Sequence, residues 1–210
     1  MSQPNILYNF KSKNFDTRKK EIQFIILHYT ETETLKKALE LLTSNKRKVS
    51  SHFLIDVNGD IYNLVPLSMR AWHAGESSWR GFEDINSRSI GIEIVNSGEK
   101  KEKKYPEIQI SSLIKLIIYL KKKFRIHPHN ILGHSDIAPL RKVDPGKYFP
   151  WSRLSKNQIG MWINEDKKND EPLDQCNFKV LIKNIEKIGY SGLEHSRDCS
   201  ENNKIIEAFH

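Results

Sequence analysis

The chain has 210 residues, with 34 Lys and Arg against 26 Asp and Glu, and a formal net charge of +8. This length allows one sizeable domain, or one domain with a small appendage. No stretch approaches the roughly 20 apolar residues of a membrane span, which excludes a helical membrane protein. The lysines form short runs with few aromatic residues between them, as solvated surfaces do, so we expect no nucleic-acid partner.

The first regular elements are a strand and a helix. Residues 21–30, EIQFIILHYT, contain a nearly continuous apolar run that predicts a strand buried on both faces and ending at the polar His28. Residues 35–42 place their apolar side chains on one helical face, and Thr32 is the candidate cap.

A hairpin and a second buried strand follow. Asn58-Gly59 is a strong turn signal between two apolar stretches and predicts a hairpin over residues 50–66. Residues 68–88 are too long and irregular for a plain connection, which indicates a functional loop. Residues 89–96, SIGIEIVN, predict a second buried strand.

The next elements are a long helix and a short strand. Pro106 can open the amphipathic helix predicted over residues 107–124. Residues 130–134, NILGH, predict a strand that leads into the charged loop GHSDIAPLRKVDPG. Strands that alternate with helices predict the α/β class, with a mixed central sheet flanked by helices.

The composition changes after Met161, where a charged linker precedes a small helical C-terminal module. The apolar pattern still runs at the last residue, so we expect this module to be truncated. Cys176 and Cys199 both lie there and could be free thiols or one disulfide. The predicted units are an N-terminal extension at 1–20, a main domain at 21–160, a linker at 161–175 and the helical segment at 176–210.

Three of the predicted strands end at or next to ionisable residues, His28, Glu93 and His134. Strand ends of an α/β sheet can meet at one crevice. Two imidazoles from His28 and His134 and the carboxylate of Asp144 would make a three-ligand zinc site with a fourth position for water. Histidines at strand ends are often only hydrogen-bonded, however, and the spacing alone does not decide between these alternatives.

The motifs FIILHYT, SSHFLID, RAWHAG, SSWRG, NSRSIGIEIVN and GHSDIAPLRKVDPG occur in this order. Together they resemble the zinc-dependent N-acetylmuramoyl-L-alanine amidases of the amidase type 2 family, which share their fold with peptidoglycan recognition proteins. The resemblance covers about residues 20 to 155, and its last motif is the most specific.

The resemblance implies a role for each polar residue of the crevice. His28, His134 and Asp144 match the ligands of one Zn²⁺ per chain. Lys142 matches a lysine that stabilises the developing oxyanion, and Glu93 matches the acidic general base. A structural ion pair between Glu93 and Lys142 is the alternative.

One position departs from the pattern of some relatives, which place a catalytic tyrosine before the histidine of the hairpin strand. Here that position is Ser51, which leaves the role of base to Glu93. We expect the next residue, His52, to be a structural hydrogen-bonding residue, and Asp136 to cap its own loop.

The functional loop is expected to form a substrate wall. Its tryptophans could stack on sugar or peptide, or could instead pack in the core. The candidate substrate-binding residues are Tyr29, Trp72, His73, Trp79, Arg80, Asn86 and Arg88.

The implied activity is hydrolysis of the amide between N-acetylmuramic or 1,6-anhydro-N-acetylmuramic acid and L-alanine, in bacterial peptidoglycan catabolism or cell-wall recycling. A non-catalytic peptidoglycan receptor on the same fold is the alternative, but such relatives commonly lose a zinc ligand. The sequence does not fix the preferred form of substrate or the oligomeric state. No secretory signal is visible, which favours the cytoplasm as the sequence stands. If the given sequence lacks a leader that the protein carries, the periplasm or cell envelope is expected instead.

Overall fold

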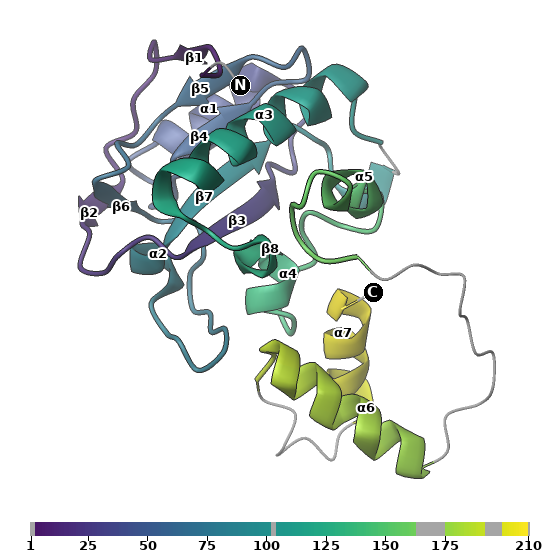
Figure 1. The fold of residues 1–210 in the computed structure, drawn as a ribbon. Helices are drawn as coiled ribbons and strands as arrows, with labels where there is room; N and C mark the ends of the chain where they lie inside the picture. Colours follow the sequence, from purple (N-terminus) through teal and green to yellow (C-terminus); the bar gives the residue numbers. More distant parts are fainter. Residues whose placement is uncertain (1–2, 102–103, 163–174, 192–198, 210) are drawn as a thin grey trace.

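The computed structural model describes residues 3–101, 104–162, 175–191 and 199–209. Its centre is a six-stranded sheet in the order β1-β5-β4-β7-β3-β8, with helices around it (Figure 1). Parallel and antiparallel pairs both occur, so the predicted mixed α/β class is confirmed. The strands are β1 (Ile6–Leu7), β3 (Phe24–Tyr29), β4 (Phe53–Ile55), β5 (Ile61–Asn63), β7 (Ser89–Ile94) and β8 (Ile131–Gly133). A separate two-stranded ladder pairs β2 (Phe15–Thr17) with β6 (Met69–Ala71).

Strand β3 lies between β7 and β8 and runs parallel to both. Its first five residues are buried, as predicted from the apolar run. The register places His28 beside Glu93 and Leu27 beside Gly133, the residue before His134. The strand ends predicted to converge therefore do so.

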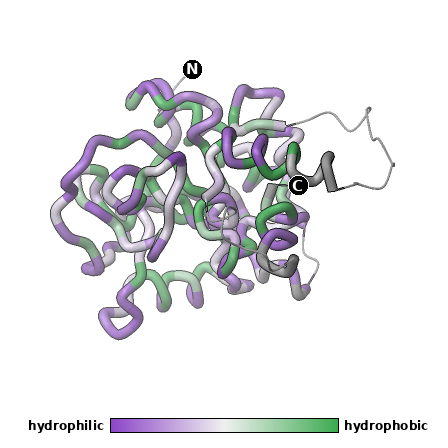
Figure 2. The backbone as a smooth tube through the Cα atoms, turned by 90° about the horizontal axis from the view of Figure 1, so that it is seen from below, coloured by the Kyte–Doolittle hydropathy of each residue, from purple (hydrophilic) through white to green (hydrophobic). Residues whose placement is uncertain are grey.

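One face of the sheet packs against α3 (Glu107–Phe124), which crosses it in Figure 1. Ile25 and Leu27 of β3 share a buried cluster with Leu113 and Ile117 of this helix. Each fully buried aliphatic side chain contributes roughly 1.5–3 kcal/mol to folding. Hydrophobic stretches accordingly run through the centre of the molecule in Figure 2, and hydrophilic residues lie mostly at its periphery.

The opposite face carries two separate apolar clusters. Ala38 and Leu42 of α1 (Leu35–Thr43) pack with Leu54 of β4 in one of them. In the other, Phe24 and Ile26 of β3 pack with residues of the short helices and the C-terminal helices. His28 and Glu93 lie on this face by strand alternation, so the polar site lies between the two clusters.

Helix α1 begins two residues later than the predicted cap implies. The side chain of Thr34 accepts a hydrogen bond from the backbone N–H of Lys37, so Thr34 and not Thr32 is the N-cap. Thr32 instead contacts Thr30, with 2.8 Å between their hydroxyl oxygens.

The N-terminal residues are part of the sheet structure, because β1 pairs with β5 and β2 with β6. The guanidinium of Arg18 donates hydrogen bonds to the carbonyls of Leu67, Met69 and Ser87. The N-terminal segment therefore stabilises both ends of the loop at residues 68–88.

The two predicted C-terminal helices are present as α6 (Gln175–Ile188) and α7 (Cys199–Phe209), next to α4 (Figure 1). Ile185, Tyr190 and Ile205 are buried in the same cluster as Phe24 of β3. Linker residues 163–174 and the side chains of both cysteines lie outside the described residues.

The remaining short helices are α2 (Ile85–Arg88), α4 (His134–Ile137), α5 (Trp151–Ser155), and the 3₁₀ turns Glu99–Lys101 and Pro128–Asn130. Within the described ranges, the helices are too short or too polar to span a bilayer.

Candidate metal centre and substrate pocket

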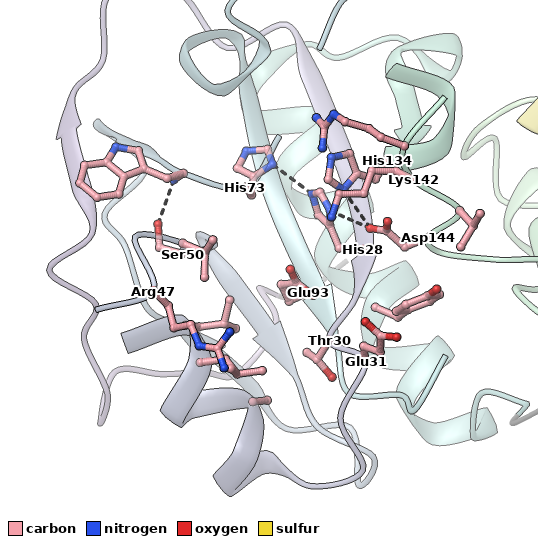
Figure 3. A pocket seen from close by; sticks show the side chains of 18 of the residues that line it. His28, Thr30, Glu31, Arg47, Ser50, His73, Glu93, His134, Lys142 and Asp144 are labelled. Carbon is pink, nitrogen blue, oxygen red and sulfur yellow. Dashed lines mark hydrogen bonds and ion pairs between the residues drawn. The ribbon is translucent and has the colours of Figure 1, made fainter. Parts of the chain in front are cut away.

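Three side chains meet at the ends of the central strands (Figure 3). The Nδ1 atoms of His28 and His134 are 3.0 Å apart, and Asp144 Oδ2 lies 3.0 Å from the first and 3.1 Å from the second. All three residues are buried, and these atoms form a group that could hold a metal ion. The structure thus brings together the three predicted ligands, although His28 lies 106 residues before His134 and 116 residues before Asp144 in the sequence.

The loop that carries Asp144 folds back on α4 by local hydrogen bonds. The backbone N–H of Ser135 donates to the carbonyl of Asp144 over 2.9 Å. The carboxylate of Asp136 accepts the N–H of Gly133 over 2.7 Å, which confirms the predicted loop cap. Tyr105 donates its hydroxyl hydrogen to the carbonyl of Pro145, so the residue that follows Asp144 is held in place as well.

The protonation pattern of the group suits a cation. His134 Nε2 lies 3.1 Å from the carbonyl oxygen of Ala74, which can only accept, so the neutral ring has its hydrogen on Nε2 and its lone pair on Nδ1. That lone pair faces Asp144 Oδ2, which is also an acceptor. Two acceptors at this distance repel each other unless a positive charge lies between them, and a bound metal ion would supply that charge.

The pKa directions agree with this pattern. Burial, and next the charge of His134, lower the pKa of His28 to about 4. Burial alone would raise the pKa of Asp144, but contact with the two imidazoles holds it below its ordinary value. At neutral pH a neutral imidazole of His28 and an ionised Asp144 are the forms that bind metal.

Glu93 lies next to His28 in the sheet, and its Oε2 atom is buried without a hydrogen-bond partner among the described residues. Burial and then the charge of Asp144 raise the pKa of Glu93 well above its usual value, while Lys142 opposes this shift. Both Glu93 and Lys142 line one pocket with the three ligands. The two form no ion pair within 4.0 Å in the described structure, so the alternative of a structural ion pair is not supported.

The pocket has a volume of about 570 Å³ and opens at the carboxyl ends of the parallel strands. Of the candidate substrate-binding residues, Tyr29, Trp72 and His73 line it. Burial, followed by the charge of Asp144, raises the pKa of Tyr29 to about 12, so its hydroxyl keeps its proton.

Residues 18–147 match the family model described as N-acetylmuramoyl-L-alanine amidase, and this match spans well over half of the chain. The chain belongs to this amidase family. The three candidate ligands, Glu93 and the other residues that line the pocket all lie within this matched range.

Relatives agree with this assignment. The chain is 34% identical to the N-acetylmuramoyl-L-alanine amidase AmiD of Escherichia coli over 90% of its own length and 73% of that protein. It is 43% identical to the 1,6-anhydro-N-acetylmuramyl-L-alanine amidase AmpD of Haemophilus influenzae, over 50% of this chain and 56% of that protein.

A solved structure shares the fold over almost the whole chain. AmiD of E. coli, in complex with the substrate anhydro-N-acetylmuramic acid-L-Ala-D-gamma-Glu-L-Lys, superposes with a TM-score of 0.78 and 30% identity. The match covers 96% of this chain and 82% of that one. Because these relatives are amidases, the catalytic interpretation is favoured over the receptor.

Two of the candidate substrate-binding residues of this amidase lie away from the pocket. Trp79 is 1% exposed and packs edge-on against Tyr190, with 4.9 Å between ring centroids. Arg80 donates its backbone N–H to the carbonyl of Gly189 and its Nε to that of Ile188. Both residues therefore contact the C-terminal segment and not the pocket. For Trp79, the structure agrees with the alternative prediction, that this tryptophan packs in the core.

Asn86 and Arg88 also lie outside the amidase pocket. Asn86 Oδ1 accepts the backbone N–H groups of His73 and Ala74, at 3.0 and 2.8 Å. Arg88 donates to the side chain of Gln23 over 3.2 Å. Asn86 therefore shapes the loop that carries His73, and Arg88 joins the end of α2 to the residue before β3.

The structure also adds pocket residues that we did not predict: Thr30, Glu31, Ala38, Leu41, Leu42, Arg47, Val49, Ser50, Glu99, Arg141 and Val143. Arg47 belongs to the run NKRK, which is typical of a solvated loop. Its position three residues before the start of the motif SSHFLID is the signal that could have identified it.

His52 is buried beneath the pocket and confirms its predicted hydrogen-bonding role. Its Nδ1 accepts the backbone N–H of Gly91 over 3.0 Å. Its Nε2 lies 3.1 Å from the carbonyl of Met69 and 2.8 Å from the guanidinium of Arg18. Burial and then the charge of Arg18 lower the pKa of His52 to about 3.

Proposed function

We propose that this amidase uses one Zn²⁺, held by His28, His134 and Asp144, to cleave the amide between the lactyl group of N-acetylmuramic acid and L-alanine. The same proposal includes the 1,6-anhydro form of the sugar. The observation that carries it is the group of three buried ligand atoms, at most 3.1 Å apart, in one pocket with an unpartnered buried carboxylate.

The donor set of two imidazole nitrogens and one carboxylate oxygen suits zinc, and it leaves a coordination position for a fourth ligand. When bound, zinc would polarise the substrate carbonyl and lower the pKa of a water molecule from 15.7 to about 7. The remaining steps fall to the side chains of the chain itself.

Glu93 accepts a proton from the attacking water as the new bond between water oxygen and carbonyl carbon forms. It then delivers this proton to the nitrogen as the carbon–nitrogen bond breaks, so the products are a lactyl carboxylic acid and a free amine. A raised pKa makes Glu93 a stronger base than an exposed carboxylate, which suits both transfers. Lys142 supplies positive charge for the oxyanion that develops on the carbonyl oxygen.

The walls of the pocket suit a muropeptide. Trp72 and Tyr29 offer aromatic faces to the sugar or the peptide. Arg47 also lines the pocket, and its side chain forms no hydrogen bond or ion pair with other described residues. We propose that this guanidinium binds a carboxylate of the stem peptide.

The test measures zinc content and hydrolysis together, on intact sacculus and on released 1,6-anhydro-muropeptide, with and without a chelator. We expect one zinc per chain, cleavage of the lactyl–alanine bond in at least one substrate, and loss of cleavage with chelator. The variant Asp144→Ala should lose both zinc and activity. One zinc per chain without cleavage of either substrate would instead support a receptor.

A further inference from the structure

A chain of hydrogen bonds leads away from His28 to a backbone carbonyl. His28 Nε2 lies 3.0 Å from His73 Nδ1, and His73 Nε2 lies 3.1 Å from the hydroxyl of Ser89. That hydroxyl donates its single hydrogen to the carbonyl of Ile85 over 2.6 Å. All three side chains are buried, so water does not replace these partners.

The direction of each hydrogen bond follows from the last one. Because the Ser89 hydrogen is used on Ile85, the Ser89 oxygen can only accept from His73, which places the hydrogen of His73 on Nε2. The neutral ring of His73 then has its lone pair on Nδ1 and accepts the Nε2 hydrogen of His28. His28 is left with its lone pair on Nδ1, toward the ligand group.

The next residue along the chain has the same effect on the second histidine. The carbonyl of Ala74 accepts from His134 Nε2, so the neutral ring of His134 also presents Nδ1 as a lone pair. Arg141 donates to the same carbonyl over 2.5 Å, which holds that oxygen in place. Two adjacent residues thus determine the tautomers of both imidazole ligands.

The position of this dipeptide is fixed from two sides. Asn86 Oδ1 accepts both of its backbone N–H groups. On the sheet side, a Cβ added to Gly91 would lie 2.4 Å from Cγ of His73, so only glycine leaves room for the ring. His73, which also lines the pocket, and Asn86, which does not, therefore have a supporting role beneath the ligand group.

We infer that His73 and Ala74 are positioning residues of the metal centre, which fix the Nε2–H tautomers of His28 and His134 and so direct both Nδ1 lone pairs to the metal. The inference rests on the metal site of the proposed function. Hydrogen-bonding partners of metal-ligating histidines commonly change metal affinity by about 10- to 100-fold. His73 contributes by its side chain, so it is the residue that mutation can test.

The experiment measures the zinc dissociation constant of the full chain by competition with a chromophoric chelator. His73→Leu removes the acceptor for His28 and should weaken zinc binding about 10- to 100-fold. His73→Asn places an amide oxygen near the position of Nδ1 and should restore most of the affinity. Ser89→Ala removes the group that orients His73 and should weaken binding in the same direction.

Ser51→Ala is the matched control, because Ser51 is equally buried but its hydroxyl has no hydrogen-bond partner among the described residues. It should leave the zinc affinity unchanged. The melting temperature of each metal-free variant shows whether the fold survives, and the visible spectrum of the cobalt-loaded protein reports ligand geometry.

Wild-type zinc affinity in both His73→Leu and Ser89→Ala would overturn the inference and leave the metal site intact. Equal losses of affinity in His73→Leu and His73→Asn, with parallel losses of metal-free melting temperature, would also overturn it, because that pattern reports packing alone. A wild-type chain that binds no zinc would overturn the proposed metal site, and with it the inference.

Discussion

Glu93 is a side chain on which the proposed chemistry depends directly. Its buried Oε2 lacks a partner among the described residues, so the carboxylate is free to exchange a proton with substrate. The variant Glu93→Gln keeps the shape of the side chain and removes the base. We expect kcat on muropeptide to fall by about 10²- to 10⁴-fold, with zinc content unchanged.

The matched control for this variant is Glu83→Gln, which makes the same change at an exposed position outside the pocket. It should retain wild-type kcat. Full activity in Glu93→Gln would show that the mechanism is wrong even though the family is right.

Arg47 tests the recognition of substrate. If its guanidinium binds a stem-peptide carboxylate, Arg47→Ala should raise KM with little change in kcat, because the contact is equally present before and during the reaction. We expect a change of about 10-fold, at the low end for a charged hydrogen bond, since Arg47 is exposed to water.

Steady-state kinetics on a muropeptide with free carboxylates would measure the effect of this variant. Lys46→Ala, an exposed neighbour that does not line the pocket, is the control. A fall in kcat at unchanged KM would contradict the proposed carboxylate contact.

Single residues differed in how far the sequence could place them. His28, Glu93 and His134 lie at the ends of buried strands, so the apolar pattern alone positions them, and the family resemblance supplied their roles. Trp79 and Arg80 lie in an irregular loop whose path depends on contacts with α6, more than 100 residues away. No local pattern encodes such a contact, which is why their predicted substrate role did not match their position.

Among the elements, the C-terminal helices pack against the catalytic sheet. Ile185 of α6 is 1% exposed in a cluster that includes Phe24 of β3. Ile185→Ala should therefore lower the free energy of unfolding by about 2–5 kcal/mol. Because the cluster joins both parts, we expect one cooperative transition in calorimetry.

Val180→Ala on the same helix is the control, because Val180 is 52% exposed. It should change the free energy of unfolding by no more than about 0.5 kcal/mol. If Ile185→Ala produced a second, earlier transition and left the main one unshifted, the helices would be an independent module.

Elements with a strong local signal were predicted well from the sequence. The Asn58-Gly59 turn forms as expected, with a φ of 88° at Gly59 that favours glycine. The start of α1 was misplaced by two residues, because Thr32 and Thr34 are equally good caps by type. In the structure the hydroxyl of Thr32 contacts Thr30, which lines the pocket, and Thr34 caps the helix. The sequence around the helix does not encode that contact.

In the whole molecule, the sheet separates a continuous apolar core under α3 from a face where two apolar clusters flank the polar site. Buried neutral histidines are a consequence of this arrangement. His28, His52 and His73 all have lowered pKa values, with burial as the largest cause. Folding therefore excludes protons that the unfolded chain would bind at mildly acidic pH.

His52 makes this consequence measurable without touching a metal ligand. Its Nδ1 accepts the N–H of Gly91, so a second ring proton would break that bond and place a charge beside Arg18. The pKa of His52 is about 3 in the folded chain, against about 6.5 when unfolded. Below about pH 6.5 the unfolded chain takes up a proton that the folded chain refuses, so stability falls as the pH falls toward 3.

The variant His52→Asn keeps an oxygen that can accept the Gly91 N–H and removes the titrating ring. Between about pH 6.5 and pH 3, the wild type should lose about 1.4 kcal/mol of stability per pH unit more than this variant. Denaturant unfolding in the presence of a chelator would measure both slopes, and His127→Asn, at an exposed histidine, is the matched control. Parallel pH dependences for wild type and His52→Asn would show that His52 accepts a proton in the folded chain, and that burial beneath the pocket does not keep its ring neutral.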